Sequence, residues 1–151
     1  MLWRRKVALA SPTDVPDEAM ARTRKSALFV AVIDDDASVR EAIESLLNSV
    51  GIKSRGFASA EAYLRASDTA SVCCLILDMR LPGMSGLELQ RRLQARGLGG
   101  ATIFVTGELD CDDRLRVQME EAGALAILRK PFDAEALTRL VRTAIDARRL
   151  R

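Results

Sequence analysis

The fold is decided by one stretch, Val72-Cys73-Cys74-Leu75-Ile76-Leu77-Asp78, in which six consecutive apolar residues end on an acid. An apolar run of this length predicts a strand that is buried on both faces of a sheet. Residues 79–86 then hold two glycines and a proline, which predicts a loop. Asp78 would stand at the carboxyl end of a central strand, where open α/β sheets bind ligands. The alternative is an acid that merely ends a strand.

The composition indicates an ordinary globular chain. Its 151 residues suffice for one domain with a hydrophobic core, and 48% of them are hydrophobic and 29% charged. The net charge of +2 does not require a nucleic acid or an anionic membrane as partner. No apolar stretch approaches the length of a bilayer span. We therefore expect a soluble protein with no direct contact to nucleic acid or membrane.

Cysteine usage and the absence of histidine exclude several kinds of chemistry. Cys73 and Cys74 are adjacent in the expected strand, so they should point to opposite faces, while Cys111 falls in an expected loop. No C-x-x-C motif occurs, which favours reduced thiols and a cytoplasmic location. Without histidine the chain has no Ser-His or Cys-His catalytic pair, no histidine metal ligand and no phosphohistidine.

Apolar runs alternate with helical patterns from residue 28 onward, which predicts a parallel sheet with helices on both faces. We expect helices to begin at capping residues Ser38, Ser59, Ser85 and Asp133, and another helix to close near Gly123. The expected strands span residues 28–33, 52–57, 72–78, 101–105 and 124–128.

Residues 1–27 differ from the rest of the chain. They start with a basic cluster and continue with two prolines and three acids within residues 11–18. This composition predicts a disordered or loosely attached extension. The domain is then expected over residues 28–147, with 148–151 as a basic end and no room for an output domain.

Polar residues follow four of the five expected strands, at what should be one edge of the sheet. Three carboxylates gathered there would repel one another and raise their pKa values unless a cation were bound. Oxygen ligands without histidine or cysteine suit a hard divalent ion, and we expect Mg²⁺. A loosely solvated rim is the alternative. The residues concerned are Asp34, Asp35, Asp78, Thr106 and Lys130.

These residue types support the transfer of a phosphoryl group to a carboxylate. Asp78, beside the glycine-containing loop, is the expected nucleophile, and Asp34 and Asp35 are expected to hold the metal. The metal, the Lys130 ammonium and the Thr106 hydroxyl would stabilise charge on the equatorial oxygens of the transition state.

Four motifs together resemble the receiver domain of two-component response regulators, and most closely its FixJ-like group. The resemblance extends from residue 28 to about residue 147. It implies a flavodoxin-like (βα)5 fold, a doubly wound parallel sheet of five strands in the order 2-1-3-4-5. The motifs are Val32-Ile33-Asp34-Asp35-Asp36, Leu77-Asp78-Met79-Arg80-Leu81-Pro82-Gly83-Met84-Ser85-Gly86, Thr106-Gly107 and Lys130-Pro131-Phe132.

The resemblance also implies a role for each site residue. Asp78 is similar to the phosphoacceptor, and Asp34 and Asp35 to the acidic pair that binds Mg²⁺. The resemblance makes the Arg80 backbone carbonyl a further Mg²⁺ ligand and the Thr106 hydroxyl the switch group. Lys130 is similar to the family's ion-pairing lysine and should form a cis peptide with Pro131.

Two departures from the family pattern concern signalling after phosphorylation. Thr106 and Lys130 are 24 positions apart, slightly more than is usual, and we expect the excess in the acidic loop around Cys111. Ile127 stands where the family usually has Tyr or Phe. Both changes affect the face made by the helix ending near Gly123, the strand 124–128 and the last helix.

The expected function is a stand-alone receiver that accepts a phosphoryl group on Asp78 from a sensor histidine kinase or a phosphotransfer protein. It would depend on Mg²⁺, turn over no separate substrate, and bind a partner or a second copy through that face. The alternatives are a binding module independent of phosphorylation and a fragment of a longer DNA-binding regulator. A phosphatase of the haloacid-dehalogenase type would need an acid where Arg80 stands.

Overall fold

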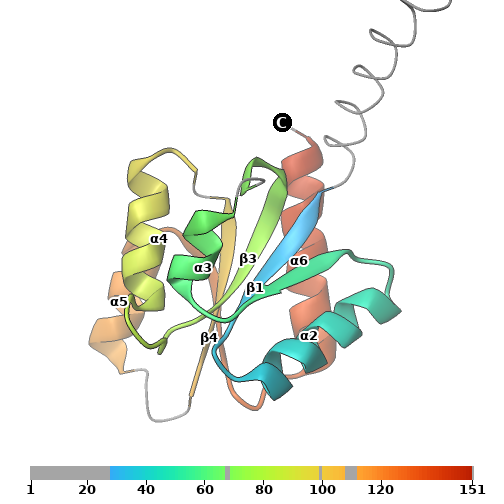
Figure 1. The fold of residues 1–151 in the computed structure, drawn as a ribbon, viewed down its shortest axis with the longest axis horizontal. Coiled ribbons are helices and arrows are strands. Elements are labelled where there is room, and N and C mark those ends of the chain that lie inside the picture. The colour runs from blue at the N-terminus through green and yellow to red at the C-terminus, as the bar shows by residue number, and fades with distance from the viewer. Residues whose placement is uncertain (1–27, 67–68, 99, 108–111, 151) are drawn as a thin grey trace, which may run out of the picture.

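The computed structural model describes residues 28–66, 69–98, 100–107 and 112–150. The predicted extension over 1–27, the Cys111 loop and Arg151 lie outside these residues. Five strands and five α-helices alternate along the described chain, with a short 3-10 helix at Thr69–Ser71 (Figure 1). They are β1 (Phe29–Ile33), α2 (Ala37–Ser49), β2 (Ser54–Phe57), α3 (Ala60–Arg65), β3 (Val72–Asp78), α4 (Gly86–Ala95), β4 (Ala101–Thr106), α5 (Asp113–Glu121), β5 (Ala124–Arg129) and α6 (Ala134–Arg149).

The strands form one parallel sheet in the order β2-β1-β3-β4-β5. This confirms the predicted doubly wound order of a flavodoxin-like fold. The central strand β3 is buried along all seven residues, as its continuous apolar run predicts. The chain changes direction across the sheet between β1 and β3, so their carboxyl ends border the crevice where such folds bind ligands.

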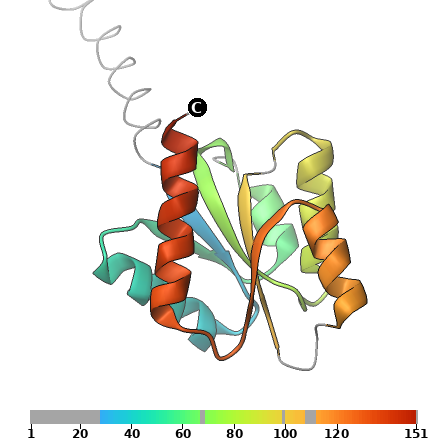
Figure 2. The same cartoon turned by 180° about the vertical axis from the view of Figure 1, so that it is seen from behind.

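Helices cover both faces of the sheet. Figures 1 and 2 show α2 and α6 on one face and α3, α4 and α5 on the other. The buried residues separate into two clusters to match: Ile43, Leu47, Leu137 and Val141 belong to one, and Tyr63, Leu89, Leu93 and Met119 to the other. No helix in the described ranges is both long enough and apolar enough to cross a bilayer.

The adjacent cysteines share one face of the sheet, so the prediction of opposite faces is wrong. Both belong to the cluster beneath α2 and α6. The register between β1 and β3 shifts at this point: Phe29 pairs with Val72 but Val30 pairs with Cys74. Cys73 is therefore the extra residue of a bulge, and an extra residue interrupts the alternation of side chains. Both thiols are free.

The cap of α2 also differs from the prediction. Asp36 caps this helix, because its carboxylate accepts from the backbone N–H groups of Ser38 and Val39, so Ser38 is already inside the helix. The predicted caps at Ser59 and Ser85 are confirmed by hydrogen bonds to the third residue beyond each.

The last helix ends at Arg149, two residues beyond the boundary expected for the domain. Arg148 is tied to the start of the central strand, because its guanidinium donates to the carbonyl oxygens of Val72 at 3.0 Å and Ala70 at 2.8 Å. Arg148, which the sequence assigned to a basic end, therefore holds α6 against the sheet.

Candidate functional site

Three carboxylates meet at the carboxyl edge of the sheet. Asp34 and Asp35 follow β1, Asp78 ends β3, and these two strands are paired neighbours. One oxygen from each carboxylate lies within 4.8 Å of the others. Asp34 and Asp78 are only 3% and 7% exposed, whereas Asp35 faces solvent. The structure therefore brings together the three acids that the sequence predicts as metal ligands.

Lys130, which directly follows the edge strand β5, also belongs to this group. Its ammonium nitrogen lies 3.1 Å from Oδ2 of Asp34 and 3.5 Å from Oδ2 of Asp78, so one cation bridges both buried carboxylates. Its backbone N–H donates to the carbonyl oxygen of Thr106 at 2.7 Å, which fixes the chain as it leaves β5. The predicted cis peptide between Lys130 and Pro131 is present.

The site carries more negative than positive charge. Burial and the charge of Asp34 raise the pKa of Asp78 to about 6, against the opposing effects of Lys130 and of the Arg80 N–H. For Lys130, burial lowers the pKa, but its hydrogen bond to Asp34 and the charge of Asp78 outweigh burial and raise it overall. The lysine is therefore charged at neutral pH, and it faces two buried acids.

The donor set fits a hard divalent cation. All three candidate ligands are carboxylate oxygens, which Mg²⁺ prefers, and added positive charge would relieve the repulsion between Asp34 and Asp78. The acids border an open cavity of about 480 Å³. Arg80 lies in its wall, and its N–H donates to Oδ1 of Asp78 at 3.2 Å. The cavity is lined by Asp34, Asp35, Asp36, Asp78, Arg80, Leu81, Pro82, Gly107 and Lys130.

Thr106 contributes a buried hydroxyl at the same edge. It ends β4 one residue beyond Val105, the register partner of Asp78, and it is fully buried. Its Oγ1 has no hydrogen-bond partner among the described residues. Leaving a buried hydroxyl unpaired costs about 1–3 kcal/mol. A group retained at that cost is a candidate for a functional contact.

The acidic loop after β1 is held by contacts that sequence reasoning missed. The guanidinium of Arg40, on α2, donates to the carbonyl oxygen of Asp34 at 2.7 Å. The backbone N–H of Asp36 donates to Oδ1 of the same aspartate at 2.9 Å. Arg40 gives no sequence signal, because an arginine on the polar face of an amphipathic helix is common.

The close approach of α4 to Asp78 yields a prediction about Gly86. A Cβ at Gly86 would meet the backbone carbonyl oxygen of Asp78. We therefore expect Gly86→Ala to lower the free energy of unfolding by about 1–3 kcal/mol, as overpacking does, although alanine normally favours a helix. Urea denaturation would measure this. At Gly100 the nearest atom is 3.8 Å from an added Cβ, so Gly100→Ala is the matched control. Equal effects of the two substitutions would contradict the prediction.

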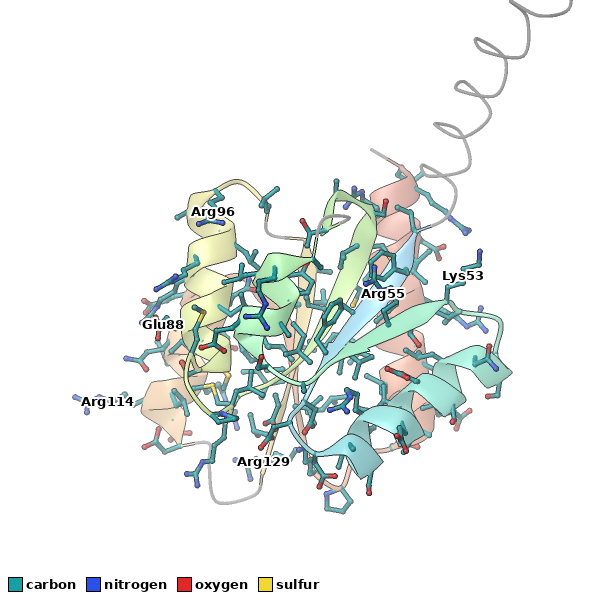
Figure 3. All side chains as sticks on the ribbon, viewed as in Figure 1. Lys53, Arg55, Glu88, Arg96, Arg114 and Arg129 are labelled. Atoms are coloured by element: carbon teal, nitrogen blue, oxygen red, sulfur yellow. The ribbon has the colours of Figure 1, made fainter. Side chains whose placement is uncertain are left out.

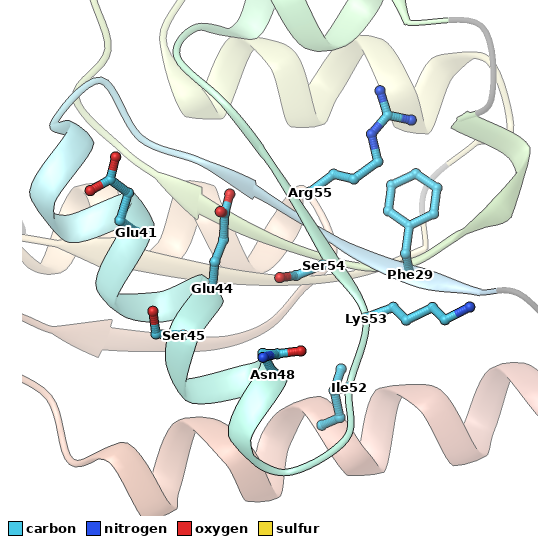
Figure 4. A pocket seen from close by; sticks show the side chains of 9 residues that line it. All are labelled: Phe29, Glu41, Glu44, Ser45, Asn48, Ile52, Lys53, Ser54 and Arg55. Atoms are coloured by element: carbon cyan, nitrogen blue, oxygen red, sulfur yellow. The ribbon is translucent and has the colours of Figure 1, made fainter.

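A larger hollow of about 740 Å³ lies at the β2 edge and contains none of the acidic cluster (Figure 4). Its wall on α2 carries Glu41 and Glu44, and Lys53 and Arg55 face it from the other side. The Arg55 guanidinium lies 5.3 Å from the Phe29 ring centroid. Figure 3 shows Lys53 and Arg55 on the β2 side, away from Arg129. Among the described residues that line this open hollow, none of the polar ones is buried, so we place the site at the acidic cavity.

Comparison with known proteins agrees with this geometry. The family model described as the response regulator receiver domain matches residues 30–142. The chain belongs to this family. The resemblance drawn from the motifs is thereby confirmed, and the site described above occupies the carboxyl edge of a receiver domain.

Curated relatives of this receiver domain are longer proteins. The chain is 40% identical over 116 residues to response regulator protein TmoT of Ectopseudomonas mendocina, covering 77% of this chain and 52% of that protein. It is 42% identical over 118 residues to transcriptional regulatory protein FixJ of Azorhizobium caulinodans, covering 78% of this chain and 55% of that protein. The chain thus spans about half the length of the curated relatives it matches.

Solved receiver domains have the same fold. A receiver domain protein from Clostridium thermocellum is 30% identical with a TM-score of 0.73, covering 82% of this chain and 98% of the other. The structure titled FixJ-N is 31% identical with a TM-score of 0.70, covering 79% and 94%. The chain is therefore a receiver domain of response regulators in two-component signalling.

Proposed function

We propose that this receiver domain accepts a phosphoryl group on Asp78 from a sensor histidine kinase or a phosphotransfer protein. The observation that carries the proposal is the Lys130 ammonium placed between the buried carboxylates of Asp34 and Asp78. In the transfer, a carboxylate oxygen of Asp78 bonds to phosphorus while the phosphorus–nitrogen bond of the donor phosphohistidine breaks. The electron pair of that bond stays on the histidine nitrogen, and a proton already on the other ring nitrogen makes the leaving imidazole neutral. The products are an aspartyl phosphate and a neutral histidine.

The charges of the site suit this step. Attack requires an ionised Asp78, and a pKa of about 6 leaves its carboxylate mostly ionised at pH 7.5. Lys130 favours that ionised form and faces the cavity in which the phosphoryl oxygens would lie. An ammonium already in place stabilises charge on those oxygens without reorganisation.

Mg²⁺ is part of the proposal. Asp34, Asp35 and Asp78 would hold the ion, with the Arg80 backbone carbonyl as a further ligand. When bound, Mg²⁺ neutralises charge on the phosphoryl oxygens. The three carboxylates themselves supply an oxygen-only cradle whose mutual repulsion favours a cation.

Thr106 is proposed as the residue that responds to phosphorylation. Its unpaired buried hydroxyl could donate to a phosphoryl oxygen on Asp78, which would gain a hydrogen bond that the unphosphorylated state lacks. Such a differential contact can shift the balance between two conformations.

We place the output on the face formed by α5, β5 and α6. Val117 on α5 and Leu125 on β5 are 48% and 42% exposed, so both elements contribute apolar surface to this face. Ile127 lines a hollow of about 270 Å³ there, in place of the usual aromatic. A protein partner or a second copy of the chain would cover this face.

A second candidate is the receiver part of a longer transcriptional regulator. The length of the matched relatives favours it, since one of them is named a transcriptional regulatory protein and the chain covers 55% of it. In either case the proposed receiver is a cytoplasmic phosphoacceptor that turns over no separate substrate. A binding module independent of phosphorylation is the alternative that the first experiment tests.

The proposal is tested by intact-mass analysis after incubation with acetyl phosphate and Mg²⁺. We expect one added phosphoryl group on the wild type, none on Asp78→Asn, and none on the wild type when EDTA is present. A time course and binding of beryllofluoride guard against a short-lived adduct. A folded wild type that binds Mg²⁺ but neither beryllofluoride nor a phosphoryl group would overturn the proposal in favour of the binding module.

A further inference from the structure

We propose that Glu61, on α3, is a positioning residue that holds the loop after Asp78 in the shape that phosphorylation requires. This inference rests on the proposed function and adds a residue that lies outside the acidic cavity. Oε2 of Glu61 accepts a hydrogen bond from the backbone N–H of Met84 at 3.0 Å. The two residues are 23 positions apart, so this contact ties α3 to the loop between β3 and α4.

The loop is shaped around this carboxylate. Gly83 has a φ of +77°, a conformation that favours glycine, and a Cβ there would lie 2.6 Å from Oε2 of Glu61. Bare backbone at Gly83 therefore lets the carboxylate reach the N–H of Met84. That hydrogen bond lowers the pKa of Glu61, as expected for an acceptor held in its charged form.

Helix α3 gives Glu61 a fixed base. Ser59 caps the helix, because its hydroxyl accepts from the N–H of Ala62 at 3.0 Å. One turn further on, Tyr63 is buried, and its ring packs edge-on against Phe57 with the centroids 5.2 Å apart. The backbone that carries Glu61 is therefore set by a cap and by the core, so the side chain can act as an anchor.

The loop that Glu61 holds begins at the phosphoacceptor. The N–H of Arg80 donates to Oδ1 of Asp78, and the N–H of Gly86 donates to the carbonyl oxygen of Met79 at 3.1 Å, closing the loop at its base. Glu61 secures the far part of this loop. Glu61 on α3 thus binds one part of the loop at Met84, and another part of the same loop, Arg80, binds the carboxylate of Asp78.

Loss of the Glu61 oxygen should therefore slow phosphorylation without removing any group that touches the phosphoryl donor. The Met84 N–H would lose its partner, and Asp78 would spend less time in the orientation that Arg80 supports. Small misplacements of reacting groups have large effects on rate, so we expect a loss of about fivefold to tenfold.

The experiment compares Glu61→Ala, Glu61→Met and Glu61→Gln in the full chain. The phosphorylation rate with acetyl phosphate and Mg²⁺ is measured by intact mass, and the Met84 amide is followed by hydrogen–deuterium exchange. The alanine and methionine variants should be slower and exchange faster. Glutamine keeps an oxygen acceptor at the same reach, so it should stay within about twofold of the wild type on both readouts. Methionine keeps the length and helix propensity of glutamate, so it serves if the alanine variant does not fold.

Glu135→Ala is the matched control. Glu135, like Glu61, lies in the first turn of a helix, so this change removes the same interaction with a helix N-terminus, at an exposed site far from Met84. Faster Met84 exchange with an unchanged phosphorylation rate in Glu61→Met would overturn the positioning role, as would a glutamine variant as slow as the methionine variant. If the wild type and Glu135→Ala both fail to take up phosphate, the proposed function itself fails.

Discussion

Replacing Lys130 with methionine is expected to slow the phosphorylation of Asp78 by acetyl phosphate about 100-fold or more. Removal of one preorganised charge-stabilising group typically costs a factor of about 10²–10³ in rate. Here the lost ammonium lies 3.1 Å from Asp34 and 3.5 Å from Asp78, so both buried acids also lose the cation that they share. The rate is measured by intact mass under saturating Mg²⁺, with circular dichroism to establish that the variant folds.

The pH dependence of the same variant gives a second readout. The charge of Lys130 lowers the pKa of Asp78, so removing it should raise that pKa above about 6. The pH at which phosphorylation reaches half of its maximum rate should then move upward. Lys53→Met makes the same change at the β2 edge, and its rate should stay within about twofold of the wild type. If Lys130→Met were no slower than Lys53→Met, the lysine would have only a structural role.

Without Mg²⁺, the ionisation of Asp78 is expected to lower the free energy of unfolding as the pH is raised from about 4 to about 6. Its pKa rises from 3.8 to about 6 on folding, so in this range the folded state binds more protons than the unfolded state. The free energy of unfolding therefore falls as pH rises through this window. The full shift corresponds to about 3 kcal/mol, and solvent in the open cavity reduces this to about 1–2 kcal/mol.

Asp78→Asn isolates this effect. The variant should be more stable than the metal-free wild type at pH 7.5 by about 1–2 kcal/mol, and the two should converge near pH 4. Mg²⁺ should stabilise the wild type more than the variant, because the variant lacks one of the three charged ligands. Urea denaturation at several pH values, with and without EDTA, would measure both differences. A wild type more stable than Asp78→Asn in EDTA at pH 7.5 would contradict the prediction.

The sequence was sufficient to predict the sheet and the convergence of the site. The apolar run ending at Asp78 predicts a strand buried on both faces, and β3 is one. Parallel strands place their carboxyl ends at one edge, so Asp34 and Lys130 could be brought to Asp78 by topology alone. These features follow from periodicity and chain order, which do not depend on the packing of individual side chains.

What the sequence could not provide depends on contacts between distant residues. The bulge at Cys73 reflects the register of β1 against β3, and nothing in the local pattern marks it. Asp36 and Ser38 are both good capping residues, and only the backbone decides between them. The anchoring of Met84 by Glu61 joins a partly buried helix position to a loop, where neither residue type signals a partner.

The pairing of Lys130 with Asp34 joins residues 96 positions apart, which directly follow β5 and β1, the last and first strands along the described chain. During synthesis Asp34 and Asp78 leave the ribosome well before Lys130 does. Until β5 pairs with β4, the carboxylates at this edge lack the cation that accompanies their burial. A nascent chain that stops short of β5 would therefore accept a phosphoryl group much more slowly than the complete domain. If Asp78 accepts the phosphoryl group, as proposed, its pairing with Lys130 also makes rapid phosphorylation depend on completion of the sheet.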